Sequence, residues 1–128
     1  MLKIWIEKAI NYLDHSLNPL PQELNELEWK ESLSPDNKKL SKHLSAFANH
    51  PGGGFLVFGI EDYSARIIGV TKADAVHIID KLSNICRDSL NPVVSIDHAI
   101  ENYSSIPLLF IYVRESGVKP VHIKAGTI

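Results

Sequence analysis

The densest group of basic side chains in the sequence is formed by Lys38, Lys39 and Lys42. Lysine ammonium groups bind phosphate oxygens, so such a cluster is a candidate contact surface for a nucleic-acid backbone. The same spacing is also typical of the solvated face of an ordinary helix. Because the formal net charge of the chain is −2, a nucleic-acid site must be a local patch, and we expect it to include these lysines.

Other residues that commonly carry catalysis lack the spacing that catalysis requires. The glycines 52–54 are not followed by the Gly-Lys-Ser/Thr of a phosphate-binding P-loop. The six histidines occur singly, without the paired spacing of a zinc hydrolase, and no serine stands in a Gly-x-Ser-x-Gly context. Cys86, the single cysteine, excludes an internal disulfide and a cysteine-based zinc site, and we expect it to be buried.

Length and composition fit one globular domain. The 128 residues have room for a single core, and the hydrophobic and charged fractions of 45% and 22% are ordinary for globular proteins. The apolar runs are far shorter than the roughly 20 residues that span a bilayer, so we expect no membrane segment. Charged residues near the N-terminus interrupt the apolar stretch that a secretory signal needs, which favours a cytoplasmic location.

The first elements follow from hydrophobic periodicity. Residues 2–17 carry an apolar stripe at helical spacing, which predicts an amphipathic helix ended by Pro19. Residues 26–33 alternate instead, with Leu27 and Trp29 on one face and charged residues on the other. This alternation predicts a strand with a charged outer face.

The middle of the chain predicts a helix, a turn and a buried strand. Asp36 is placed to cap a helix that runs to about Asn49 and carries the three lysines on its outer face. The glycine-rich residues 50–54 predict a tight reversal, because glycine reaches positive φ without steric cost. The uniformly apolar residues 55–60 then predict a central strand.

The second half repeats the alternation of elements. We expect a short strand at 66–70, a helix from Thr71 to the Pro92 region, and a hairpin of strands around 94–100 and 106–113. This order predicts an α+β fold: a single domain with a mixed, mostly antiparallel sheet flanked by helices. Nine residues are predicted to share one core: Leu27, Trp29, Leu44, Phe47, Leu56, Phe58, Ile79, Leu82 and Leu109.

Three segments in this order and spacing resemble one family. In residues 23–33, acidic residues precede Glu-Trp-Lys. Residues 46–62 begin with Ala-Phe-Ala-Asn, which is followed by a run of glycines and then by an apolar stretch that predicts a strand. Residues 67–70 are Ile-Ile-Gly-Val. Together they resemble the Schlafen AlbA-like DNA-binding domain, a module of bacterial proteins described as divergent AAA-type or as transcriptional regulators. The combination is more specific for the fold than for an activity.

The resemblance implies an AlbA-like domain at residues 23–128, preceded by an N-terminal helix and linker at 1–22. It implies a nucleic-acid-binding regulatory module, with DNA or RNA as the partner and without catalysis. Family members usually continue beyond the position of Pro120 with another strand. We therefore expect a C-terminal strand that is truncated here or supplied by a partner.

A second function follows from the same resemblance, because some Schlafen proteins are endoribonucleases with three acidic residues at positions that match Glu23, Glu28 and Asp62. Such carboxylates would bind Mg²⁺ or Mn²⁺ and cleave RNA. Glu23 and Glu28 would face opposite sides of one regular strand, so convergence requires Glu23 to lie in a loop after Pro21. Acidic residues on a solvated face are the simpler interpretation, and a role without catalysis is preferred.

The remaining predictions concern contacts with partners. A third function is protein interaction, in which the N-terminal helix packs on a second copy through Trp5 and Ile6. Lys30 shares a strand face with Glu28, where it forms an ion pair or touches a phosphate. The predicted nucleic-acid contacts are Lys30, Lys38, Lys39, Lys42 and Asn49.

Overall fold

Helix α1 (Ile6–Leu17) forms because apolar residues recur at helical spacing and bury one stripe, which includes Ile6, Ala9 and Leu13. The computed structural model describes residues 3–124 and starts this helix at Ile6 rather than at the predicted residue 2, which lies outside the described residues. The helix ends at Asn18, where the backbone becomes extended. The amphipathic N-terminal helix is thus confirmed, with a shorter N-terminal part.

Two polar caps start the other helices where the sequence placed them. The side chain of Asp36 accepts hydrogen bonds from the N–H groups of Lys38 and Lys39, at 3.0 and 3.3 Å, and begins α2 (Asn37–Asn49). The hydroxyl of Thr71 accepts from the N–H of Asp74 at 3.0 Å and begins α3 (Lys72–Asp88).

The main sheet has the strand order β1-β2-β5-β4. Strand β1 pairs parallel with β2, whereas β2 with β5 and β5 with β4 pair antiparallel, so the sheet is mixed and mostly antiparallel, as predicted. A second, two-stranded sheet joins β3 (Leu90–Asn91) to β6 (His122–Ile123). The four strands of the main sheet are β1 (Leu27–Lys30), β2 (Gly54–Phe58), β4 (Ile96–Tyr103) and β5 (Ile106–Val113).

One predicted strand is wrong. Residues 66–70 form only an isolated bridge between Ile67 and Ile60. The chain crosses itself at Gly59 and Gly69, so it does not pair further with another strand. The N–H groups of Ile68 and Gly69 both donate to the carbonyl of Gly59 at 2.8 Å. A Cβ on Gly59 would lie 2.9 Å from the backbone of Gly69, so this crossing requires glycine.

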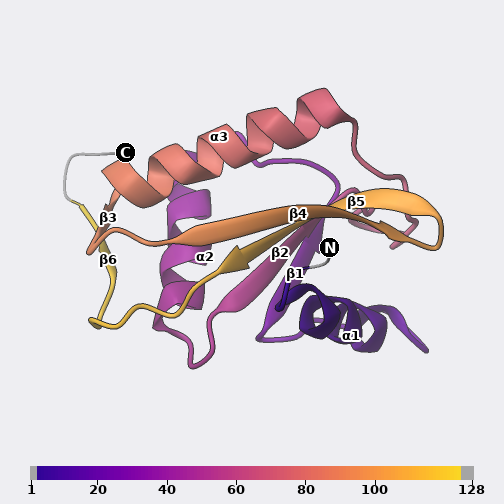
Figure 1. Ribbon diagram of the computed structural model, residues 1–128, viewed down its shortest axis with the longest axis horizontal. Coiled ribbons are helices and arrows are strands. Elements are labelled where there is room, and N and C mark those ends of the chain that lie inside the picture. The colour runs from indigo at the N-terminus through magenta and orange to yellow at the C-terminus, as the bar shows by residue number, and fades with distance from the viewer. Residues whose placement is uncertain (1–2, 125–128) are drawn as a thin grey trace.

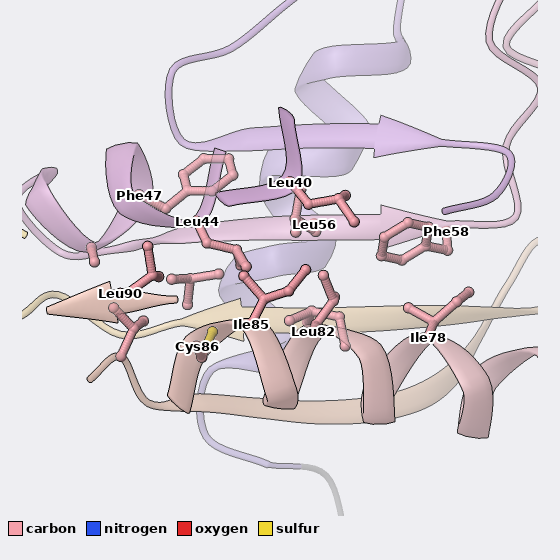
Figure 2. Packing of buried hydrophobic residues seen from close by; sticks show 14 of the residues in the cluster. Leu40, Leu44, Phe47, Leu56, Phe58, Ile78, Leu82, Ile85, Cys86 and Leu90 are labelled. Carbon is pink, nitrogen blue, oxygen red and sulfur yellow. The ribbon is translucent and has the colours of Figure 1, made fainter. Parts of the chain in front are cut away.

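The sheet lies between α1 on one face and α2 with α3 on the other (Figure 1). Each face has its own hydrophobic cluster, so the prediction of one shared core is wrong: alternating side chains send Leu27 and Trp29 to α1, while Leu56 and Phe58 face α2 and α3. Figure 2 shows the α2–α3 cluster. Besides Leu56 and Phe58, it includes the predicted residues Leu44, Phe47, Leu82 and Leu109, with Ile79 only partly buried against it.

The predicted dimer surface on α1 is also wrong. Trp5 and Ile6 are 9% and 0% exposed, because they pack against the sheet of their own chain. The Trp5 ring lies 6.1 Å from the ring of Phe55 and 5.7 Å from that of Tyr112. These two residues are therefore unavailable to a second copy. Helix α1 is a layer of the fold, and the predicted boundary between residues 22 and 23 remains a prediction.

The glycine run after α2 is explained by packing. Gly52 and Gly53 have φ values of +84° and +77°, which glycine adopts without strain. A Cβ on Gly54 would lie 1.8 Å from the ring of Phe47, so the first residue of β2 must lack a side chain for the phenylalanine to pack on its backbone. The Phe47 and Gly54 positions of the motif therefore lock α2 onto β2.

The single cysteine is buried in the α2–α3 cluster, as predicted. Burial raises the pKa of the Cys86 thiol to about 12, since the thiolate would lose its hydration there. None of the helices within residues 3–124 is long and apolar enough to cross a membrane.

Candidate nucleic-acid interface

A cleft of about 560 Å³ opens beside β1, between the segment at 21–25 and helix α2. All three predicted acidic residues line it: Glu28 from β1, Asp62 from the turn after β2, and Glu23 from the loop that precedes β1. Glu23 lies outside the strand, as convergence required. The structure therefore brings residues far apart in sequence to one cleft.

The wall that carries Glu23 is held by a buried serine of α1. The Ser16 hydroxyl donates to the carbonyl of Gln22 at 2.6 Å, and the N–H of Gln22 donates to the carbonyl of Ser16 at 2.7 Å. The indole N–H of Trp29 in turn donates to the Ser16 hydroxyl at 3.1 Å. Ser16 is fully buried and its two side-chain bonds are partly buried, so together they fix the segment before Glu23 relative to β1.

Glu28 is paired on both sides within the cleft. Its Oε2 lies 3.1 Å from Nδ1 of His43, and its Oε1 lies 3.8 Å from Nζ of Lys30. All three side chains are about one-third exposed, so the pairs are partly screened by water. The ion pair predicted between Lys30 and Glu28 is confirmed as a loose contact, and His43 is the nearer partner.

Asp62 is held by the backbone of the strand beside it. Its Oδ1 accepts a hydrogen bond from the N–H of Glu31 at 3.1 Å, which ties the turn after β2 to the end of β1. The neighbouring carboxyl of Glu61 is bound by Ser64 and Arg66 within the same turn. The hydrogen bond from Ser64, together with Arg66, holds the pKa of Glu61 below its ordinary value.

A second hollow of about 280 Å³ adjoins the cleft and differs from it in charge. The two share Lys30, His43 and Asp62, but the second adds Lys39 and lacks Glu23 and Glu28. We call the first the acidic cleft and the second the basic hollow. The basic hollow also has an apolar floor and two serines at its side; these residues are Leu33, Leu40, Leu56, Phe58, Ser32 and Ser34.

The three carboxylates do not form a metal site as they are arranged. Among residues 3–124, no group of three or more His, Cys, Asp or Glu side chains could hold a metal ion. Glu23, Glu28 and Asp62 line one cleft without converging on one ligand position, and a shared cation would require their side chains to move. The assignment of Mg²⁺ or Mn²⁺ to them remains a prediction.

The predicted lysine cluster is divided between two strips of α2. Lys39 lines the basic hollow, one helical turn before His43, which lines both hollows. Lys38 and Lys42 are also one turn apart, but they lie on the exposed outer strip and outside the lining of both hollows. The lysines therefore present a surface that extends from the basic hollow outward, rather than one compact patch.

Asn49, one of the predicted nucleic-acid contacts, has a structural role in the fold. Its Nδ2 donates to the carbonyl of Val121 at 3.0 Å, and its Oδ1 accepts from the N–H of the same residue at 2.7 Å. Both ends of the amide are thus used to fasten the segment before β6 to the end of α2. The amide keeps a second N–H and a second lone pair, so a contact of Asn49 with nucleic acid remains a prediction beside this structural role.

His43 is the site residue that the sequence did not reveal, because no second histidine lies at a paired helical spacing from it. A signal was present in the helical spacing. Positions 39, 43 and 46 share one strip of α2, beside the buried stripe of Leu40 and Leu44. Side chains that lie next to the buried stripe of a helix are close to the sheet. They can therefore contact a neighbouring strand, as His43 contacts Glu28 of β1.

Comparisons with known proteins agree with this fold. Residues 23–128 match the model of the family described as Schlafen, AlbA_2. An uncharacterized ATP-binding protein of Ureaplasma parvum is 27% identical over a 115-residue alignment that covers 78% of this chain and 32% of that protein. The chain therefore spans about a third of the length of this curated relative.

Two solved structures share the fold at 23% sequence identity. One is the N-terminal domain of a Nitrosomonas europaea protein described as an ATP-dependent DNA helicase RecG-related protein, with a TM-score of 0.67, covering 94% of this chain and 81% of that chain. The other is a protein of Corynebacterium diphtheriae, with a TM-score of 0.56, covering 91% of this chain and 23% of that chain.

Proposed function

Because the chain belongs to the Schlafen AlbA_2 family, we propose that it is a nucleic-acid-binding regulatory module whose contact surface is the acidic cleft with the basic hollow. One observation carries the proposal: Lys30, Lys39 and His43, from two different elements, line the same small hollow. Two ammonium groups and an imidazole around one concavity can bind a phosphate from several sides. The description of the Nitrosomonas neighbour as helicase-related supports a nucleic-acid ligand.

The charge distribution sets how such a ligand would lie. The net charge of −2 gives little long-range attraction for a polyanion, so affinity must come from a few direct phosphate contacts. Phosphates would sit in the basic hollow and along Lys38 and Lys42 outside it. The phosphates of the ligand would be repelled by Glu23 and Glu28, so its uncharged parts would face the acidic cleft.

A binding titration tests this proposal. We expect Lys30→Glu with Lys39→Glu to weaken binding of labelled DNA or RNA at least tenfold, and to flatten the dependence of log affinity on log salt by about 0.7 to 0.9 for each phosphate that the protein no longer neutralises. Adding Lys38→Glu and Lys42→Glu should abolish binding. Lys8→Glu with Lys72→Glu is the matched control, because it makes the same charge change at exposed positions of α1 and α3 outside both hollows, and it should act only through net charge. Equal losses in the control and the double variant would contradict the proposal.

A metal-dependent endoribonuclease is the second candidate, favoured by the fact that Glu23, Glu28 and Asp62 line one cleft beside Lys30. The present arrangement does not suit a cation, so we derive no catalytic step from it. The test is cleavage of a structured RNA with Mn²⁺, compared between the unaltered chain, Asp62→Asn and Glu28→Gln. Activity that survives either substitution would exclude this mechanism and leave the binding module.

A further inference from the structure

The turn after β2 presents an aromatic side chain fully to solvent at the acidic cleft. Tyr63 has a relative exposure of 102% and lines the cleft beside Glu28 and Asp62. Every other aromatic side chain within residues 3–124 is buried or half-buried. A fully exposed tyrosine contributes nothing to the core, and tyrosine is enriched at binding interfaces because it combines an apolar ring with a polar hydroxyl.

The turn that carries Tyr63 is closely hydrogen-bonded. The N–H of Ala65 donates to the carbonyl of Glu61, and the N–H of Glu61 donates to the carbonyl of Arg66, both at 2.9 Å. Nη2 of Arg66 also lies 3.1 Å from Oε2 of Glu61. Asp62 ties the turn to β1 through the N–H of Glu31. The backbone that carries the ring is therefore already ordered, so binding has to order the Tyr63 side chain but not the turn.

We propose that Tyr63 is a stacking platform for an unpaired nucleobase, and that the ligand of this surface is single-stranded nucleic acid. This inference rests on the proposed function and names its ligand class. The base would lie on the Tyr63 ring over the acidic cleft, while its phosphates reach Lys30 and Lys39 in the adjoining basic hollow. Base pairs within a duplex have their faces covered by neighbouring pairs, so a duplex cannot make this contact.

Charge supports the same occupant. A nucleobase is uncharged, so it can lie beside Glu23 and Glu28, which line the acidic cleft alone and would repel a phosphate. The cleft is also lined by the half-buried apolar side chains of Leu24 and Trp29. A single strand can place its base and its phosphate in different hollows because its backbone is flexible, and stacking tolerates any base because each has a π face.

The test compares a labelled single strand of about 12 nucleotides with the duplex of the same sequence, since single-strand sites are of this order of length. We expect Tyr63→Ala to weaken single-strand binding about tenfold and to leave both duplex binding and the salt dependence unchanged. Tyr63→Phe keeps the ring and should bind like the unaltered chain. Val76→Ala, at an exposed apolar position of α3, is the control for loss of an exposed apolar side chain. The melting temperature of Tyr63→Ala should be unchanged, because the side chain is fully exposed.

The outcomes separate the two proposals. Stacking is overturned if Tyr63→Ala binds single strands as tightly as the unaltered chain does, or if it loses as much affinity for the duplex as for the single strand. In either case, a dependence of binding on Lys30 and Lys39 would still support the binding module. A single strand with abasic positions should bind the unaltered chain and Tyr63→Ala alike; a remaining tenfold difference would also overturn stacking. If the unaltered chain binds neither form, both proposals fail.

Discussion

The two faces of the sheet are held by different kinds of contact. On the face of α2 and α3, aliphatic side chains such as Leu44, Leu82 and Leu109 make up most of the cluster. On the face of α1, the rings of Phe55 and Tyr112 lie 5.2 Å apart in a stacked pair, and polar bonds run across the layer. Three aromatic side chains donate there: Trp5 to Asp97 at 2.8 Å, Trp29 to Ser16 and Tyr103 to Asp14.

This difference assigns different tasks to the two faces. Aliphatic packing depends on volume and burial, so the α2–α3 face contributes stability mainly through buried area, with Phe47 on Gly54 and Asn49 with Val121 as its local directional contacts. Hydrogen bonds and ring contacts depend on direction, so the α1 face fixes the position of the helix on the sheet. Since Ser16 of α1 also holds the segment before Glu23, the α1 face sets the geometry of the cleft wall.

The largest effect on stability is expected in the aliphatic face. Leu82→Ala removes a fully buried side chain and should lower the free energy of unfolding by about 2 to 5 kcal/mol, measured by urea titration. Val76→Ala on the same helix is 56% exposed and should change it by less than about 0.5 kcal/mol. Nucleic-acid affinity of the folded Leu82→Ala protein should be unchanged. A loss of affinity without unfolding would break the assignment of tasks.

A smaller effect on stability, with a larger effect on the cleft, is expected for Ser16→Ala. The carbonyl of Gln22 and the indole N–H of Trp29 would lose their partner in a buried position, which should cost about 1 to 3 kcal/mol. The segment with Glu23 should loosen, and single-strand affinity should fall. Ser45→Ala, whose hydroxyl bonds only to its own helix, is the control and should preserve affinity. If both serine variants bind alike, the α1 face does not set the cleft.

The sequence predicted the elements well wherever a local signal decided them. Asp36 and Thr71 carry their caps within the next three residues, and the apolar run of β2 has no other stable place than the centre of a sheet. The acidic trio could be assigned to one cleft only through the family resemblance. No local signal relates Glu23 to Asp62, since loop and turn geometry brings them together.

The burial of α3 shows why other predictions failed. Helical spacing is satisfied by a stripe through Val76 and the predicted core residue Ile79, whereas the structure buries Ala75, Ile78 and Ile85. Both stripes share Leu82 and Cys86, so periodicity alone cannot choose between them. The contacts of the helix with other elements decide which stripe is buried, and the sequence does not show those contacts. The same reason hid His43 and the pairing of Asn49 with Val121, which depend on contacts between distant segments.

A pH titration sharpens the polar side of the comparison. Burial alone would raise the pKa of Asp97, but hydrogen bonds from Lys3, Trp5 and the N–H of His98 outweigh it and lower that pKa to about 2. A lowered carboxyl pKa stabilises the fold above its unfolded value, and the contribution is lost as pH falls through the folded value. Unfolding free energy should therefore fall between about pH 4 and pH 2.

The matched variant for that titration is Asp97→Asn, which cannot ionise. It should lose about 1 to 2 kcal/mol at neutral pH and show a smaller decrease between about pH 4 and pH 2 than the unaltered chain. Urea midpoints measured across this range give both values. Identical slopes for the two proteins would mean that Asp97 does not carry the polar attachment of α1.

The smallest effect is expected for Tyr103→Phe. The Tyr103 hydroxyl donates to Oδ1 of Asp14, and burial, followed by this carboxylate, raises the pKa of Tyr103 to about 12. Asp14 is exposed, so water can replace the missing partner, and the cost should be about 0.5 to 1 kcal/mol. A thermal melt is sufficient to measure it. A loss as large as that of Leu82→Ala would show that the polar face carries stability after all.

The buried thiol of Cys86 makes the chain convenient for spectroscopy. The thiolate is the form that attacks thiol-labelling reagents, and a thiol with a pKa of about 12 is almost entirely protonated at neutral pH. The natural sequence is therefore already a background for labelling at one chosen position. Ala46 is exposed and lines the acidic cleft, so Ala46→Cys would accept a fluorophore or a spin label there. Such a probe would report the arrival of a strand beside Glu28 directly, without a second substitution to silence Cys86.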